Sequence, residues 1–176
     1  MKRIGVERLR ELYEEVEHRS LRLECRQAYS VPWEDEGFAA WQRGEPEPPS
    51  PSFQRHLATC RSIVASGRRI VRVRFVEVPL TLYSRYEFET GYPQSSEAGE
   101  EVSVLNRAEH PEFDHVREDF VVFDDTSVLY YRYSDDDQLL GYDYSDDPST
   151  VAEHVALAEE VLAAATPLAQ WSPRIR

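Results

Sequence analysis

Lysine is almost absent from this sequence, since Lys2 is the only one and every other basic residue is arginine. Cysteine is scarce as well, and the spacing of Cys25 and Cys60 matches neither a redox motif nor a zinc finger. No apolar run approaches the roughly 18 residues of a membrane-spanning helix, and no apolar signal-peptide core follows Met1. We therefore expect a cytoplasmic protein, without a membrane span, whose two cysteines are ordinary buried thiols.

Positive charge is in deficit throughout the chain. Lysine and arginine total 20 against 33 aspartates and glutamates, which gives a formal net charge of −13. Proteins that bind nucleic acids present positive charge to the phosphates, and anionic membrane surfaces repel acidic proteins. The composition therefore predicts no direct binding to nucleic acid or membrane, and favours a partner with a basic surface.

Glycine is also scarce, with 7 residues in the chain, and the glycine-rich motifs of phosphate-binding and hydrolase sites are missing. Neither a phosphate-binding loop nor the G-x-S-x-G turn of a serine hydrolase occurs. Hydrophobic residues nevertheless make up 41% of the chain and aromatic residues 11%, which is typical of folded proteins. A length of 176 residues suits one domain, so we expect residues 1–176 to form a single domain.

The hydrophobic periodicity predicts an α+β fold. Short acidic turns separate the last three apolar runs, which indicates antiparallel hairpins. We therefore expect a mainly antiparallel sheet with N-terminal, central and C-terminal helices packed on it. Segments 43–52 and 91–99 are expected to be loop and turn, and Ser149 or Thr150 to cap the last helix. The expected helices are 4–17, 34–42, 53–65, 80–88 and 149–165, and the expected strands are 20–31, 69–78, 102–105, 119–123, 128–133 and 139–144.

The clearest strand, 69–78, carries two arginines on one face. Arg72 and Arg74 alternate with apolar residues, so both side chains point to the same side. One interpretation is architectural: the guanidinium groups form cross-strand ion pairs with carboxylates. The plausible partners are Glu24, Glu87 and Asp119.

The other interpretation is a site for a small anion, in which arginines hold the substrate and a carboxylate acts as general base or metal ligand. A pocket in which these groups converge would favour this interpretation, whereas closed ion pairs would argue against it. The binding candidates are Arg72, Arg74, Arg85 and Tyr83, and the catalytic candidates are Glu24, Glu87 and Asp119.

Three groups of possible metal ligands are interpreted as structural. Segment 110–115 is dense in histidine and carboxylates, but its spacing matches no defined site and Pro111 indicates a surface loop. The acidic turns lack the ligand order of a calcium-binding EF-hand loop. His56 precedes Cys60 by four residues on an expected helix, yet Cys60 falls on the apolar stripe. We therefore predict no metal site and no cofactor.

A series of short motifs runs through most of the chain. It comprises Arg22-Leu23-Glu24 with Tyr29, Trp41 with Gly44, the strand 67–78 with Pro79, Thr81, Tyr83, Arg85-Tyr86-Glu87, Ala98-Gly99-Glu100, and Asp119-Phe120 with Phe123-Asp124. In order and spacing the series resembles a domain-of-unknown-function family that is widespread in streptomycetes and related actinobacteria. Genes of that family often lie beside helix-turn-helix regulators. Its recurring residues have no established roles; here they are Glu24, Arg72, Arg85, Glu87, Glu100 and Asp119.

The acidic charge and this resemblance together lead to one functional hypothesis. We expect a non-enzymatic accessory or regulatory protein that binds a protein partner, such as a helix-turn-helix regulator with a basic DNA-facing surface. The alternative is an enzyme with a carboxylate–arginine site that acts on a small anionic substrate. The oligomeric state is left open.

Overall fold

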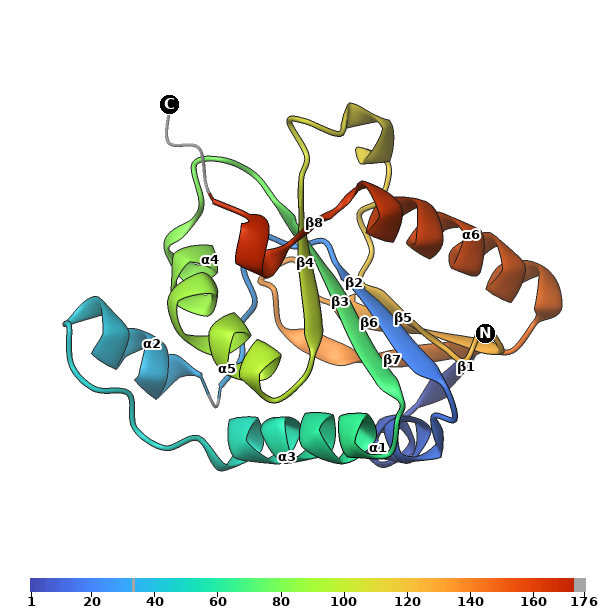
Figure 1. The fold of residues 1–176 in the computed structure, drawn as a ribbon, viewed down its shortest axis with the longest axis horizontal. Helices are drawn as coiled ribbons and strands as arrows, with labels where there is room; N and C mark the ends of the chain where they lie inside the picture. Colours follow the sequence, from blue (N-terminus) through green and yellow to red (C-terminus); the bar gives the residue numbers. More distant parts are fainter. Residues whose placement is uncertain (33, 173–176) are drawn as a thin grey trace.

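All strands of the described residues join one mixed sheet. The structure, a computed structural model, describes residues 1–32 and 34–172, and its eight-stranded sheet has the order β1-β7-β6-β5-β2-β3-β4-β8 (Figure 1). The strands are β1 (Lys2–Ile4), β2 (Arg19–Glu24), β3 (Arg69–Val76), β4 (Glu101–Asn106), β5 (Phe120–Phe123), β6 (Ser127–Tyr133), β7 (Leu139–Ser145) and β8 (Thr166–Pro167). The helices are α1 (Val6–Glu15), α2 (Asp35–Gln42), α3 (Pro51–Ala65), α4 (Leu82–Tyr86), the π-helix η1 (Glu87–Gly91), α5 (Tyr92–Glu97), the 3₁₀ helix η2 (Pro111–Phe113), α6 (Pro148–Ala164) and the 3₁₀ helix η3 (Leu168–Gln170).

The sheet divides into a parallel and an antiparallel part. Strands β2, β3 and β4 are parallel, because helical crossovers connect them, whereas β5, β6 and β7 form the expected antiparallel hairpins. Five of the seven strand pairs are antiparallel. The predicted α+β class is therefore confirmed.

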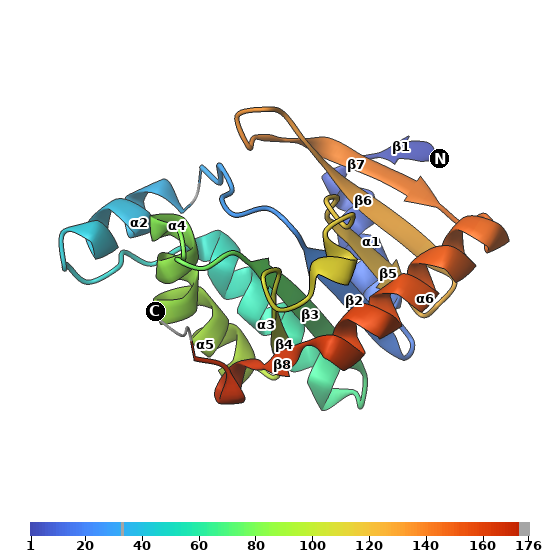
Figure 2. The ribbon, with the colours of Figure 1, turned by 90° about the horizontal axis from the view of Figure 1, so that it is seen from above.

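Helices cover both faces of the sheet. On one face, α6 packs against the apolar side chains of the central strands, including Leu21, Val73 and Phe75. On the other face, α1 covers the antiparallel part and α3 packs beside β3 (Figure 2). Burial of these apolar surfaces contributes most of the stability, at about 25 cal/mol for each Å² removed from water. Central strand β3 is consequently buried on both sides.

Several element boundaries differ from those that the sequence predicts. The expected turn 91–99 is largely helical, because Pro93 occupies the first turn of α5, where its missing N–H is tolerated. The strand expected over 20–31 ends at Glu24. Asp147, rather than Ser149 or Thr150, caps α6, since its carboxylate accepts the N–H of Thr150 at 2.9 Å.

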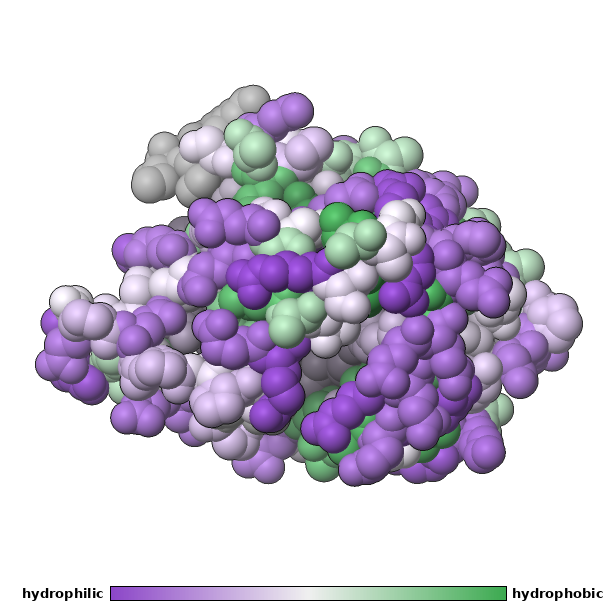
Figure 3. All heavy atoms as spheres, turned by 60° about the horizontal axis from the view of Figure 1, so that its bottom comes forward, coloured by the Kyte–Doolittle hydropathy of each residue, from purple (hydrophilic) through white to green (hydrophobic). Residues whose placement is uncertain are grey.

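The surface is polar on the side where α3 and α1 lie. In Figure 3 hydrophilic residues dominate this face, and apolar residues form only small areas between them. Over residues 1–32 and 34–172, no helix combines the length and the hydrophobicity that crossing a bilayer requires.

The link between α1 and β2 depends on Asp124. This residue has φ of 50° in the β5–β6 turn, and its carboxylate accepts the N–H groups of Glu17, His18 and Arg19, each at 2.8 Å. Burial opposes ionisation, but the three backbone donors outweigh it and lower the pKa of Asp124. One carboxylate thus joins two turns that are distant in sequence.

We expect Asp124→Asn to lower the free energy of unfolding by about 1–3 kcal/mol, because a neutral amide cannot accept all three N–H groups. Asparagine tolerates the positive φ, so the loss reports the hydrogen bonds rather than backbone strain. Urea denaturation at pH 7 measures the change. The matched control is Asp125→Asn in the same turn, which removes only the exposed ion pair with Arg19 and should change stability by less than about 1 kcal/mol. Equal effects of the two substitutions would contradict this account.

Candidate functional site

Charged side chains occupy the face of the central strands that lies under α4 and α5. Parallel pairing sets Arg22 opposite Arg72 and Glu24 opposite Arg74, and the alternation of side chains places all four on this face. The side chain of Arg74 is 0% exposed and that of Glu24 is 4% exposed. Charges that are buried this deeply require partners.

Arg72 is the central cation of the group. Its Nη1 lies 2.5 Å from Oε1 of Glu24, and its Nε lies 2.7 Å from Oε1 of Glu100, which follows α5. Arg22 also approaches Oε1 of Glu24, at 2.9 Å, and the hydroxyl of Tyr92 donates to Oε2 at 2.9 Å. Glu24 is therefore satisfied by two strands and one helix.

Arg74 connects the same group to the helices and the loop after β2. Its Nη2 donates to Oε2 of Glu87 at 3.0 Å, and its Nη1 donates to the carbonyl of Arg26. The hydroxyl of Tyr29 donates to Oδ2 of Asp119 at 2.6 Å and lies 3.3 Å from Nη1 of Arg74. We call the seven charged residues of this group the buried charge network; they are Arg22, Glu24, Arg72, Arg74, Glu87, Glu100 and Asp119.

The buried charge network contains three guanidinium groups and four carboxyl groups, so its charges do not cancel when all are ionised. Burial opposes ionisation of Glu24 and Glu100, but the arginines outweigh it and lower both pKa values, that of Glu100 to about 2. For Glu87 burial prevails over the attraction of Arg74 and raises the pKa to about 7. Burial likewise raises the pKa of Asp119. Protonation of Glu87 relieves part of the surplus negative charge.

The structure places the sequence candidates in different surroundings. Arg72 and Arg74 form the closed ion pairs of the architectural interpretation, with Glu24 and Glu87 among their partners. Asp119 lies 3.9 Å from Arg22 rather than beside either of these arginines. Arg85 is 53% exposed and pairs with Glu89 at 3.7 Å, outside the buried charge network. The catalytic and binding roles of these residues remain predictions.

Tyr83, the remaining candidate, lines a pocket next to the buried charge network. The pocket has a volume of about 260 Å³ and lies between the loop after β2, α2, α4 and the β6–β7 turn. Figure 2 shows α2 and α4 side by side at this end of the molecule. Three of the lining residues are aromatic and four are acidic, and no basic residue is among the ten that the described chain contributes. The aromatic residues are Tyr29, Phe38 and Tyr83, and the acidic ones are Glu34, Asp35, Asp136 and Asp137.

Glu34 is a half-buried acidic residue of this pocket. Its Oε2 accepts a hydrogen bond from the hydroxyl of Tyr83 at 2.6 Å, and no ion pair joins it to a basic residue of the described chain. Burial raises its pKa, because the half-buried carboxylate has lost part of its hydration. Asp137, in contrast, is already paired with Arg26. We call this cavity the acidic aromatic pocket.

Sequence reasoning did not identify Glu34 and Phe38 as site residues, and it interpreted Asp136 as part of a structural acidic turn. The spacing of Glu34 and Phe38, four residues apart at the start of α2, was a usable signal, because it places an acid and an aromatic ring on one helical face. Their position against Tyr83 depends on the packing of α2 on α4, which periodicity does not reveal.

The fold and the site define an α+β protein with a mixed sheet, a buried charge network under its crossover helices and an acidic pocket at one end. Residues 7–173 match the family described as Domain of unknown function (DUF6879), so the chain belongs to this family. The expected membership of a domain-of-unknown-function family is thus confirmed. No curated protein sequence matches the chain.

Among solved structures, the fold is similar to that of TrmBL2, an archaeal chromatin protein whose structure "shows a novel mode of DNA binding". The TM-score is 0.51 at 13% sequence identity, and the similarity covers 92% of this chain and 49% of that chain. This chain thus spans about half the length of that protein. The prediction of no direct nucleic-acid binding is wrong, because a DNA-binding protein shares this fold. Net charge alone therefore does not exclude nucleic-acid binding.

We expect Arg72→Met to lower the free energy of unfolding at pH 7 by about 3–5 kcal/mol, because it leaves two buried carboxylates without their shared cation. The pH dependence gives a second signature. In the native protein the lowered pKa values of Glu24 and Glu100 contribute stability above pH 4.5, the ordinary pKa, which is lost as the pH falls toward 2. In the variant both carboxyls take up protons more readily, so its deficit should shrink between pH 7 and pH 5.

Thermal and urea unfolding at several pH values measure both effects. Arg85→Met is the matched control, since it removes an arginine that is 53% exposed and should change stability by less than about 1 kcal/mol. A deficit for Arg72→Met that is constant with pH would contradict the role assigned to Arg72.

Proposed function

We propose that this protein is a non-enzymatic binding protein whose acidic aromatic pocket takes an arginine or lysine side chain of a basic segment in a partner protein. The observation that supports this most directly is Glu34, a half-buried carboxylate that faces the pocket without a basic partner in the described chain. A guanidinium or ammonium group would supply the missing charge.

The walls of the pocket suit such a side chain. Cations are attracted to the faces of aromatic rings, and here the ring centroids of Phe38 and Tyr29 lie 5.9 and 6.0 Å from that of Tyr83. A volume of about 260 Å³ fits one long side chain better than a drug-sized ligand. The net charge of −13 adds a long-range attraction for a basic segment.

The same features disfavour the alternative of an enzyme for small anions. Four carboxyl-bearing residues line the pocket, and they would repel an anionic substrate. The guanidinium groups of Arg72 and Arg74 are engaged by Glu24, Glu100 and Glu87, so substrate would have to displace buried ion pairs. A protein partner with a basic segment is therefore the better-supported proposal.

The test is calorimetric titration of the full chain with glycine–serine peptides that carry a central arginine, lysine or glutamine. We expect the arginine and lysine peptides to bind and the glutamine peptide not to bind. Glu34→Gln should weaken binding about tenfold or more, because a charge-assisted hydrogen bond is lost. Glutamine still accepts from Tyr83, and the half-buried charge is gone, so this variant should unfold at the same temperature as the native protein or higher.

The charge-matched control is Glu160→Gln on α6, which covers the other face of the sheet and should leave peptide binding unchanged. A parallel titration uses duplex DNA. The proposal fails if Glu34→Gln binds the arginine peptide as tightly as the native chain, if neither basic peptide binds, or if the protein binds DNA while the peptides do not.

A further inference from the structure

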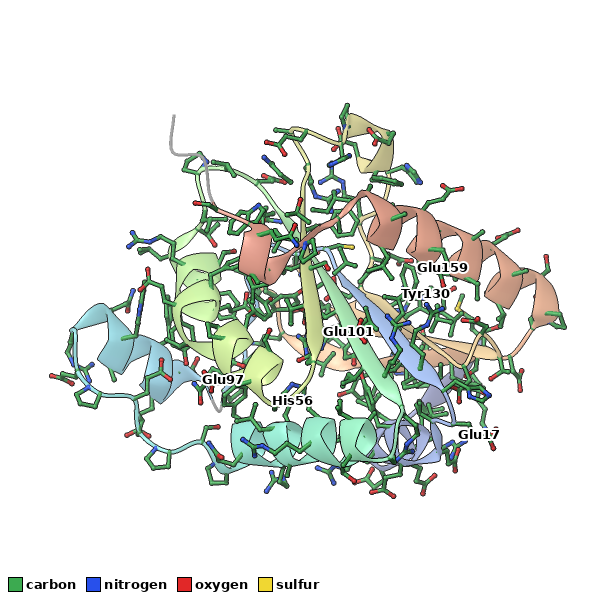
Figure 4. The ribbon with its side chains drawn as sticks, in the orientation of Figure 1. Glu17, His56, Glu97, Glu101, Tyr130 and Glu159 are labelled. Atoms are coloured by element: carbon green, nitrogen blue, oxygen red, sulfur yellow. The ribbon has the colours of Figure 1, made fainter. Side chains whose placement is uncertain are left out.

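A second cluster of polar side chains lies at the opposite end of the buried charge network, between α3 and α5. His56 and Cys60 occupy successive turns of α3, and Glu100 lies in the short link between α5 and β4. One ligand atom from each residue lies within 4.8 Å of the other two. Figure 4 shows His56 where α3 faces the end of α5.

The distances within this cluster match those around a tetrahedral metal ion. Nε2 of His56 lies 3.6 Å from Sγ of Cys60 and 3.2 Å from Oε2 of Glu100. With metal–ligand distances of about 2.0–2.3 Å, neighbouring ligands of tetrahedral zinc are about 3.3–3.8 Å apart. The His56–Cys60 distance lies within this range and the His56–Glu100 distance lies just below it, so two edges of the coordination polyhedron need only a small adjustment.

Glu100 is oriented by a residue outside the cluster. Arg72 holds Oε1 of this carboxylate at 2.7 Å, which leaves Oε2 directed at the imidazole of His56. Partners of this kind fix the orientation of ligands in known metal sites. The hydroxyl of Ser95, 3.4 Å from Nε2 of His56, adds a further oxygen beside the cluster.

The chemistry of the three donors selects the class of ion. Thiolate, imidazole and carboxylate together suit zinc and similar divalent transition metals, whereas magnesium and calcium prefer oxygen alone. Burial, followed by the charge of Glu100, raises the pKa of Cys60 to about 12, so the thiol is protonated until a cation arrives. His56 is 31% exposed, which gives the cluster an opening to solvent.

We propose that His56, Cys60 and Glu100 form a binding site for a divalent transition-metal ion such as Zn²⁺, in which water supplies the fourth ligand. Binding replaces the thiol proton of Cys60, so one proton is released for each ion that binds. This site is separate from the acidic aromatic pocket and does not depend on the function proposed for it.

The test is optical titration of the full, metal-free chain with Co²⁺, followed by competition with Zn²⁺. We expect one equivalent to bind with the near-ultraviolet charge-transfer band of a thiolate–cobalt bond, and Zn²⁺ to remove that band. Cys60→Ser should abolish the band, and His56→Gln should weaken binding at least about tenfold. Apparent affinity should rise with pH, because the thiol loses its proton on binding.

Cys25→Ala is the matched control, because Cys25 is the other buried free thiol and lies outside the cluster. It should keep both the band and the stoichiometry. Because Cys60 is fully buried, its substitution can unfold the protein, so circular dichroism is used to check that Cys60→Ser is folded. If it is not, His56→Gln tests the site independently, since His56 is only half-buried. The proposal is overturned if the native chain gives no charge-transfer band, or if His56→Gln binds Co²⁺ like the native chain; the cluster is then an imidazole–carboxylate pair beside a buried thiol.

Discussion

The shared ion pair of Arg72 with Glu24 and Glu100 is the interaction on which the arrangement of this molecule depends. Glu24 belongs to β2, Arg72 to β3, and Glu100 immediately precedes β4, so one guanidinium joins three parallel strands. A buried ion pair adds little net stability, but separating one is strongly destabilising because it leaves a charge unpaired. Helix α5 is tied to this group by Tyr92, whose hydroxyl donates to Glu24, so a shift of α5 relative to the sheet would break a hydrogen bond to a buried charge.

The two acidic regions of the protein differ in where their compensating charge comes from. Within the buried charge network the arginines belong to the same chain, and the one surplus carboxyl is accommodated at Glu87, whose pKa of about 7 permits partial protonation near neutrality. In the acidic aromatic pocket the one direct hydrogen bond that side chains of the described residues donate to the Glu34 carboxylate comes from the hydroxyl of Tyr83, and Arg72 and Arg22 attract its charge from a distance. The compensating charge is internal in the first region, and under the proposed function a ligand supplies it in the second. Tyr29 borders both regions.

Much of the sheet could be predicted from the sequence, because side-chain alternation and turn residues are local features of the chain. Alternation alone placed Arg72 and Arg74 on one face of a strand, and opposite charge identified Glu24 and Glu87 as partners. The short acidic turns correctly indicated hairpins among β5, β6 and β7. What sequence could not supply was the parallel register of β2 and β3, which sets Arg22 beside Arg72, since register between distant strands depends on crossover helices rather than on either strand.

The acidic aromatic pocket and the His56 cluster could not be predicted from the sequence either, because both depend on contacts between segments that are distant in sequence. Each assembles side chains from segments whose contact is decided by helix packing: α2 on α4 for Glu34 and Tyr83, and α3 on α5 for His56 and Glu100. Cys60 lies on the apolar stripe of α3, as periodicity predicts, and is fully buried, yet the same position brings its sulfur near an imidazole. Cys60 can therefore be both a core residue and a metal ligand, and hydrophobic periodicity alone does not distinguish these two roles.

Net charge misled the sequence argument about nucleic acid because it is a sum over the whole surface, whereas binding depends on where charges lie. This chain and the DNA-binding chromatin protein share a fold at only 13% sequence identity, so the shared fold does not show where charges lie on either surface. The informative quantity is local: a carboxylate that has lost water and gained no cation. Glu34 meets that condition in its direct contacts, because it is half-buried and no ion pair joins it to a basic residue of the described chain. Under the function proposed above, the net charge of −13 steers a basic segment toward the protein, and Glu34 binds its cationic side chain.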